Sequence, residues 1–331
     1  MLSVIFAIIP TVQSDIHLHN TRNSEYVDSK TKEGDTALHL SIKRGYHNIT
    51  TLLLERGANI NSKDQDGNTP THKAVLFNYP NILKMLIQRK ADINIANDAG
   101  EFPLLTAVTN EYLDLVQILV EGNAIINCDT ALHLSIKRGY YNITRLLLER
   151  GANINSKDQD GNTPTHKAVL FNYPNILKML IQRKADINIP NDAGEFPLLT
   201  AVTNEYLDLV QILVEGNAII NCCNDTNKNP LAVAIRQDNT AILKLFFEKG
   251  VKANDKIGGA PLLQLAVLNA SVDVTRFLLE HGADYTFKTE DGETLLYLAI
   301  YNDFTNLAEL ILTVTTVAPP PNGLHSNVEI Y

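Results

Sequence analysis

Four histidines recur at a fixed spacing and are the first candidates for chemistry in this sequence. His39 and His72 lie 33 residues apart, as do His133 and His166. Imidazole is the commonest protein ligand for metal ions, so a regular series of histidines could indicate a metal site. The four side chains, however, occupy the same slot of successive repeated segments. This arrangement predicts one structural role used four times, and we expect no metal and no other cofactor.

The remaining candidate motifs lack residues that their chemistry requires. Asp64, Asp66 and Asn68 resemble the start of a calcium-binding loop, but Thr69 and Val75 stand where that loop needs glycine and glutamate. No phosphate-binding glycine loop, nucleophile elbow or zinc-protease motif occurs in the chain. Because no catalytic set of residues is present, we expect that the protein is not an enzyme.

Three cysteines bear on redox chemistry, Cys128 and the adjacent pair Cys222 and Cys223. Their odd number and the absence of a CxxC motif argue against a disulfide framework. This pattern favours reduced thiols and a cytoplasmic protein. The adjacent pair leaves two interpretations open, a redox role or two ordinary free thiols.

Bulk composition narrows the classes of partner. The 331 residues carry a net charge of −9, which argues against a nucleic-acid partner. No stretch is long and apolar enough to span a membrane, so we expect no membrane insertion. The apolar run 2–9, followed by Ser14, resembles a short signal peptide over residues 1–14. Secretion therefore stays open as the alternative to a cytoplasmic location.

A 33-residue period organises most of the chain. The segment Gly34-Asp-Thr-Ala-Leu-His39 is followed by Gly67-Asn-Thr-Pro-Thr-His72 and then by Gly100-Glu-Phe-Pro-Leu-Leu105. The same frame returns at Thr130, Thr163, Phe196, Asn229, Ala260 and Thr294. A period of this length with a Thr-Pro-Leu-His-like signature resembles the ankyrin-repeat family.

The resemblance implies an all-α fold, an ankyrin-repeat solenoid of about nine helix-turn-helix units with short finger turns. We call the loop between one helix pair and the next a finger. Three parts are expected, namely an N-terminal segment 1–33, a repeat array 34–315 and a disordered, proline-containing tail 316–331. In this family the repeated histidine is a structural hydrogen-bonding residue, which agrees with its spacing here.

The repeated columns also have physical reasons. Thr69-Pro70 is typical of a helix start, because the threonine caps the helix and proline needs no hydrogen-bond partner there. Gly57 suits the left-handed residue that closes the second helix, whereas Lys90 and Lys184 replace it at a cost of up to about 1 kcal/mol. Every repeat has a small residue four positions after the proline slot, which allows close helix packing. These residues are Ser41, Ala74, Ala107, Ser135, Ala168, Ala201, Ala234, Ala266 and Ala299.

A larger repeat is superimposed on the short one. Residues 35–128 recur at 129–222 with three differences, His47/Tyr141, Thr51/Arg145 and Ala96/Pro190. The copies join at a seam where most of one finger is missing. Either a recent duplication or an assembly error in the source sequence would explain this near-identity.

The ankyrin resemblance implies a partner protein bound by the finger tips and by the exposed side of each first helix. The corresponding residues are Lys63, Gln65, Asp66, Asn68, Leu76, Phe77, Lys157, Gln159, Asp160, Asn162, Leu170 and Phe171. Leu76 and Phe77 are candidate apolar anchors, although one of them could instead pack against the next repeat. We expect a monomeric interaction scaffold or adaptor that binds another protein. A secreted or host-delivered ankyrin-repeat effector or toxin is the alternative.

Overall fold

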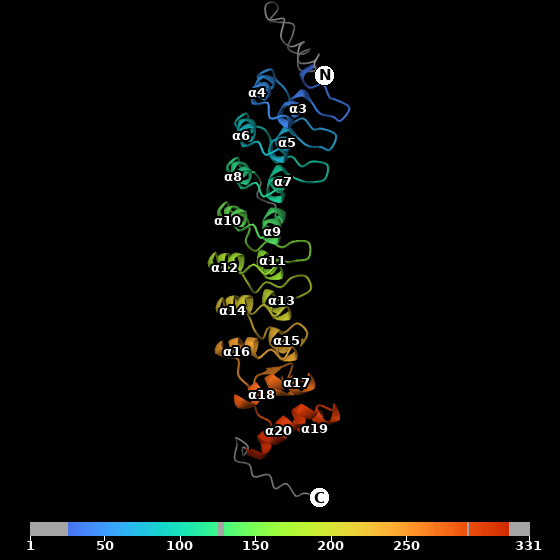
Figure 1. Cartoon of the computed structure of the whole chain (residues 1–331), viewed down its shortest axis with the longest axis vertical. Coiled ribbons are helices and arrows are strands. Elements are labelled where there is room, and N and C mark those ends of the chain that lie inside the picture. Colours follow the sequence, from blue (N-terminus) through green and yellow to red (C-terminus); the bar gives the residue numbers. More distant parts are fainter. Residues whose placement is uncertain (1–25, 125–128, 290, 318–331) are drawn as a thin grey trace, which may run out of the picture. The chain divides into compact units, whose positions relative to one another are not determined.

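The computed structural model of this chain describes residues 26–124, 129–289 and 291–317. It divides into two compact units, residues 1–152 and 153–331. Within the described residues, four helix pairs form the first unit and five form the second (Figure 1). The predicted all-α architecture of repeated helix pairs is confirmed.

The first unit contains the helices α3 to α10. Their bounds are α3 (Ala37–Lys43), α4 (His47–Glu55), α5 (Pro70–Leu76), α6 (Pro80–Gln88), α7 (Pro103–Thr109), α8 (Leu113–Glu121), α9 (Asp129–Lys137) and α10 (Tyr141–Glu149). Each first helix packs against its own second helix, and α3, α5 and α7 each also pack against the first helix of the next repeat. The unit is therefore held by contacts between neighbouring repeats, as expected of a repeat protein.

The second unit contains the helices α11 to α20 and one short hairpin. The helix bounds are α11 (Pro164–Leu170), α12 (Pro174–Gln182), α13 (Pro197–Thr203), α14 (Leu207–Glu215), α15 (Pro230–Arg236), α16 (Thr240–Glu248), α17 (Leu262–Leu268), α18 (Val272–Glu280), α19 (Leu295–Tyr301) and α20 (Thr305–Val317). The antiparallel strands β1 (Lys256–Ile257) and β2 (Ala260–Pro261) pair within the finger before α17.

The small-residue slot lies at the centre of each helix pair. All nine predicted residues are buried, and the least buried of them, Ser41, has an exposed fraction of 4%. The Ser41 hydroxyl donates to the backbone oxygen of Leu38 at 2.9 Å and also lies 3.0 Å from the Thr50 hydroxyl. A larger side chain here would push the packed helices apart, so the slot has a direct steric reason.

The finger before α5 is organised by one buried carboxylate. Asp64 Oδ1 accepts hydrogen bonds from the backbone N–H groups of Asp66 at 3.0 Å and Asn68 at 2.8 Å. Its other oxygen, Oδ2, lies 2.5 Å from Nζ of Lys73 on α5. Asp158 and Lys167 form the same ion pair in the second unit, also at 2.5 Å. Each pair fastens a finger to the helix that follows it.

Helix packing continues across the seam of the duplication, which lies within the first unit. α7 packs against α9, and α8 packs against α10. Glu121 and Arg150 form an ion pair at 3.4 Å, as Glu55 and Arg89 do two repeats earlier. Helix α9 begins at Asp129, whereas the equivalent helix α3 begins at Ala37, two positions later in the repeat. The shortened connection at the seam is therefore compatible with contact between the helices on both sides.

The ends of the chain differ in part from the sequence expectation. The last helix, α20, runs from Thr305 to Val317 and so extends into the predicted tail 316–331. The possible signal peptide 1–14 and the rest of the tail lie outside the described residues.

Lys90 gives a test of the backbone at the helix ends. This residue has a φ of 64° where the equivalent Gly57 has a φ of 83°. A lysine side chain strains this left-handed conformation, so we expect Lys90→Gly to raise the free energy of unfolding by about 0.5–1 kcal/mol. Urea denaturation measures this change. Lys84→Gly, in the middle of α6, is the matched control and should lower the same quantity by about 1 kcal/mol. The prediction would be contradicted if Lys90→Gly and Lys84→Gly lowered the free energy of unfolding by similar amounts.

Candidate protein-binding surface

The predicted finger residues of the first unit fall into two groups. Lys63, Gln65 and Asp66 are exposed at the finger tip. Asn68 is half-buried, and its side-chain oxygen accepts a hydrogen bond from Asn97 Nδ2 at 3.1 Å. Asn68 thus joins one finger to the next, and the other three side chains present the polar tip.

Lys63 is exposed but also bonded to the neighbouring finger. Its Nζ donates to the backbone oxygen of Ala96 at 2.9 Å, and in the second unit Lys157 Nζ donates to the oxygen of Pro190 at 2.9 Å. Ala96 and Pro190 are one of the three differences between the copies. Because proline keeps its carbonyl group, the substitution leaves this contact intact.

The second unit repeats the same arrangement. Lys157, Gln159 and Asp160 are exposed, while Asn162 is half-buried and its side-chain oxygen accepts from Asn191 Nδ2 at 3.2 Å. The two finger tips are therefore equivalent in residue type and in local hydrogen bonding.

The last residue of the first helix is exposed in every repeat. These residues are Lys43, Leu76, Thr109, Lys137, Leu170, Thr203, Arg236, Leu268 and Tyr301. Leu76 and Leu170 have exposed fractions of 45% and 46%. Phe77 and Phe171, one position later, are half-buried, and the ring of Phe77 stacks on Tyr79 at 6.5 Å. In both units the leucine is therefore more exposed to solvent than the phenylalanine that follows it.

The histidines have the structural environment predicted for them. His39, His72 and His166 are buried, and the imidazole Nδ1 of each accepts a hydrogen bond from the backbone N–H of the threonine that caps the helix. His133 is buried in the same slot. Within the described ranges, no three His, Cys, Asp or Glu side chains come together in a way that could hold a metal ion.

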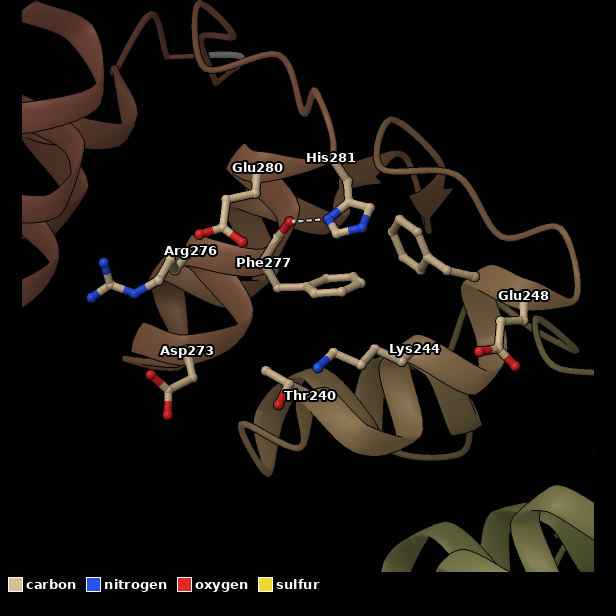
Figure 2. Close-up of a pocket in the computed structure, with 9 residues that line it drawn as sticks. Thr240, Lys244, Glu248, Asp273, Arg276, Phe277, Glu280 and His281 are labelled. Carbon is tan, nitrogen blue, oxygen red and sulfur yellow. Dashed lines mark hydrogen bonds between the residues drawn. The ribbon is translucent and has the colours of Figure 1, made fainter. Parts of the chain in front are cut away.

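A groove between α16 and α18 in the second unit escaped sequence analysis. It has a volume of about 510 Å³ and is lined by the rings of Phe247, Phe277 and His281. The His281 ring stacks on Phe277 with centroids 4.0 Å apart, and its Nδ1 donates to the Phe277 backbone oxygen at 2.7 Å. Figure 2 shows both rings turned toward the hollow and Arg276 extending away from it. The phenylalanines Phe247 in α16 and Phe277 in α18 were the sequence signal that could have revealed the groove.

Helix pairs stacked at a 33-residue period and joined by fingers define a class of solenoid repeat proteins. The chain belongs to the ankyrin-repeat family, because the family model described as ankyrin repeats (3 copies) matches residues 9–97, 90–158, 104–191 and 166–257. No curated protein matches the sequence.

Solved structures agree with this assignment. The ankyrin repeat domain of Bcl-3, described as a unique member of the IkappaB protein family, is 25% identical with a TM-score of 0.60, and the match covers 65% of this chain and all of that domain. An ankyrin repeat domain from Acinetobacter baumannii AYE is 25% identical with a TM-score of 0.53, covering 55% of this chain and 98% of that one.

The human ASB11 ankyrin repeat domain is 22% identical, with a TM-score of 0.53 and coverage of 64% and 98%, and supports the fold alone. Across the described part of the chain, no helix is both long enough and apolar enough to cross a membrane.

Proposed function

We propose that this protein is an interaction scaffold that binds another protein through two matching surfaces, one on each compact unit. The first surface comprises Lys63, Gln65, Asp66, Leu76 and Phe77. The second comprises Lys157, Gln159, Asp160, Leu170 and Phe171. Ankyrin repeats are generally protein-interaction modules, and this family membership supports the class of function.

The exposure of Leu76 and Leu170 is the observation that carries the proposal. Three of the nine first helices end in Lys or Arg at this slot, so a solvated charge fits it without loss. A leucine there gains less from burial than a core leucine does, because nearly half of its surface stays in water. Apolar side chains with a half-buried aromatic neighbour and a polar rim are typical of interface anchors.

The slot itself supplies a substitution that tests the proposal. Lys43 and Arg44 occupy the positions of Leu76 and Phe77 one repeat earlier. We therefore expect the double variant Leu76→Lys/Phe77→Arg to keep the free energy of unfolding within about 1 kcal/mol of the wild type. Binding at that surface should weaken by at least about 30-fold, the loss of an anchor worth about 2 kcal/mol.

The test uses a partner protein that has been isolated by its binding to the full chain. Calorimetry then measures how many partner molecules bind each chain, which distinguishes two sites from one. A monomeric partner should bind at two equivalents per chain to the wild type and at one to Leu76→Lys/Phe77→Arg. Adding Leu170→Lys/Phe171→Arg should abolish binding. Thr109→Lys is the control and should leave both sites intact. Thr109 is the last residue of α7, the position equivalent to Leu76 in α5. Binding that survives all four substitutions and is lost in Lys244→Glu/Arg276→Glu would place the partner on the groove between α16 and α18 instead.

A further inference from the structure

The finger between α14 and α15 contains the only adjacent pair of cysteines in the sequence. The sulfur atoms of Cys222 and Cys223 lie 3.5 Å apart, and both residues are half-buried. The first copy of the duplication has a single cysteine at this point, because Cys128 is followed by Asp129. One chain therefore holds an adjacent pair of cysteines and, at the equivalent point of the first copy, a cysteine with no cysteine next to it in the sequence.

The pair is connected to the start of α15 through Asn229, which is fully buried. Asn229 Nδ2 donates to the backbone oxygen of Cys223 at 2.6 Å, and its Oδ1 accepts from the N–H groups of Leu231 at 3.0 Å and Ala232 at 3.3 Å. One side chain thus both caps the helix and fixes the carbonyl group of Cys223. A change in the backbone at Cys223 would reach the first turn of α15.

The geometry of neighbouring cysteines favours a labile disulfide over a permanent one. Consecutive Cα atoms are about 3.8 Å apart, which is shorter than the roughly 4.4–6.8 Å found across ordinary disulfides. A bond between Cys222 and Cys223 would therefore be strained. Strained disulfides have more oxidising potentials and are easily reduced, so the thiol and disulfide forms could interconvert.

We propose that Cys222 and Cys223 form a reversible redox-modification site that is oxidised by a low-molecular-weight disulfide such as glutathione disulfide. The Cys223 thiolate attacks one sulfur of the oxidant, forms a mixed disulfide and releases one thiolate. Cys222 then loses its proton to water, attacks the Cys223 sulfur and expels the second thiolate. The protein dithiol loses two electrons, and one disulfide is reduced to two thiols.

The environment of the two sulfur atoms supports this order of attack. Burial raises the pKa of Cys222 to about 12, and the adjacent Cys223 sulfur adds to the rise. Cys222 therefore keeps its proton and donates it toward the sulfur of Cys223. The Cys223 sulfur accepts this hydrogen bond, which assigns the first attack to Cys223.

The experiment uses the full chain treated with glutathione disulfide and analysed by peptide mass spectrometry. The peptide with both cysteines should lose the mass of two hydrogen atoms, and dithiothreitol should restore it. Cys222→Ser and Cys223→Ser should instead each gain one glutathione. Hydrogen exchange at Leu231 and Ala232 should become faster in the oxidised wild type, because closing the ring reorients the backbone held by Asn229.

A second probe tests the reduced pair without oxidation. Phenylarsine oxide bridges two close thiols, so it should bind one equivalent to Cys128→Ser and resist a competing monothiol. It should be displaced readily from Cys128→Ser/Cys223→Ser. Equal displacement from both variants would overturn the proposal. So would a disulfide between Cys128 and either partner in the wild type, or glutathione retained as a stable adduct on the pair.

Discussion

Asp64→Asn is expected to lower the free energy of unfolding by about 3 kcal/mol, because it removes one charge from a buried ion pair and leaves the other. The side chains of Lys73 and Asp64 have exposed fractions of 10% and 3%. Asparagine can keep the finger hydrogen bonds through Oδ1, but its amide group would then face the Lys73 ammonium group. The unpaired Lys73 charge is poorly hydrated because only 10% of its side chain is exposed, and this desolvation dominates the loss.

The next repeat provides the matched control. Asn97 takes the place of Asp64 there, and its Oδ1 accepts from the N–H groups of Ala99 at 3.1 Å and Glu101 at 2.9 Å. The residue in the slot of Lys73 is then Thr106. The double variant Asp64→Asn/Lys73→Thr reproduces a pair that the chain already uses, so we expect it to recover about 2 kcal/mol of the loss.

The second unit adds a graded comparison. Lys167 and Asp158 are more exposed than their counterparts, with exposed fractions of 14% and 18%. Water can solvate the remaining charge more fully there, so Asp158→Asn should cost less than Asp64→Asn. Urea denaturation of the four proteins measures these differences. Two results would show that the ion pair does not fasten the finger. Either Asp64→Asn would be as stable as the wild type, or Asp64→Asn/Lys73→Thr would be no more stable than Asp64→Asn.

The acid sensitivity of this pair has a defined direction. Burial alone would raise the pKa of Asp64, but hydrogen bonds from Lys73 and from the amides of Asn68 and Asp66, with the charge of Lys73, outweigh it and lower the pKa. The carboxylate thus stabilises the fold above its unfolded pKa of about 3.9. That contribution is lost as the pH falls through the lower pKa of the folded state.

The repeat architecture could be predicted from sequence because its determinants are local. Thr69-Pro70 indicates a helix start, and the small residue at Ala74 indicates close helix packing. The structure confirms both, with Thr69 as the N-cap and Ala74 fully buried. Each feature depends on a few consecutive residues and recurs in register, so repetition separates it from chance.

Contacts between segments were not predictable in the same way. Lys73 occupies a slot that holds Leu40 in the preceding repeat, and nothing in the sequence indicates that a finger carboxylate reaches it. The different exposure of Leu76 and Phe77 was equally hidden. Both lie where α5 ends, and only the position of the following turn, with Tyr79 beside Phe77, decides which of them faces solvent.

The free energy of unfolding is also expected to fall steeply as the pH is lowered from about 7 to 5, because three histidines are held neutral in the fold. In the repeat of His72, Nδ1 accepts from the Thr69 N–H at 3.1 Å and Nε2 lies 3.0 Å from the Glu101 backbone oxygen. Nε2 must carry the proton to donate to that oxygen, so Nδ1 is unprotonated. A second proton, on Nδ1, would face the Thr69 N–H and break the helix cap.

The same conclusion follows from burial. Burial lowers the pKa of His39, His72 and His166, and the hydrogen bond of each to a backbone oxygen offsets this only in part. In the unfolded chain a histidine titrates near about 6.5. Between the folded and unfolded pKa values the unfolded chain binds more protons, so stability is complete above about 6.5 and declines as the pH falls.

Each such histidine contributes a slope of at most about 1.4 kcal/mol per pH unit. The histidine effect begins near the unfolded pKa of about 6.5, well above the unfolded pKa of Asp64, so the two effects are separable at their onset. We expect His72→Ala to lower the free energy of unfolding by about 1–2 kcal/mol at pH 7.5, through its lost hydrogen bonds. The same variant should also lose about one third of the pH dependence of the free energy of unfolding that the three histidines cause.

Leu105→Ala is the control, because Leu105 occupies the same slot of the next repeat and has no ionisable group. This variant should lower the free energy of unfolding without changing its dependence on pH. Urea titrations at several pH values measure both quantities, and a slope unchanged by His72→Ala would mean that the capping histidines are not the groups that sense acid.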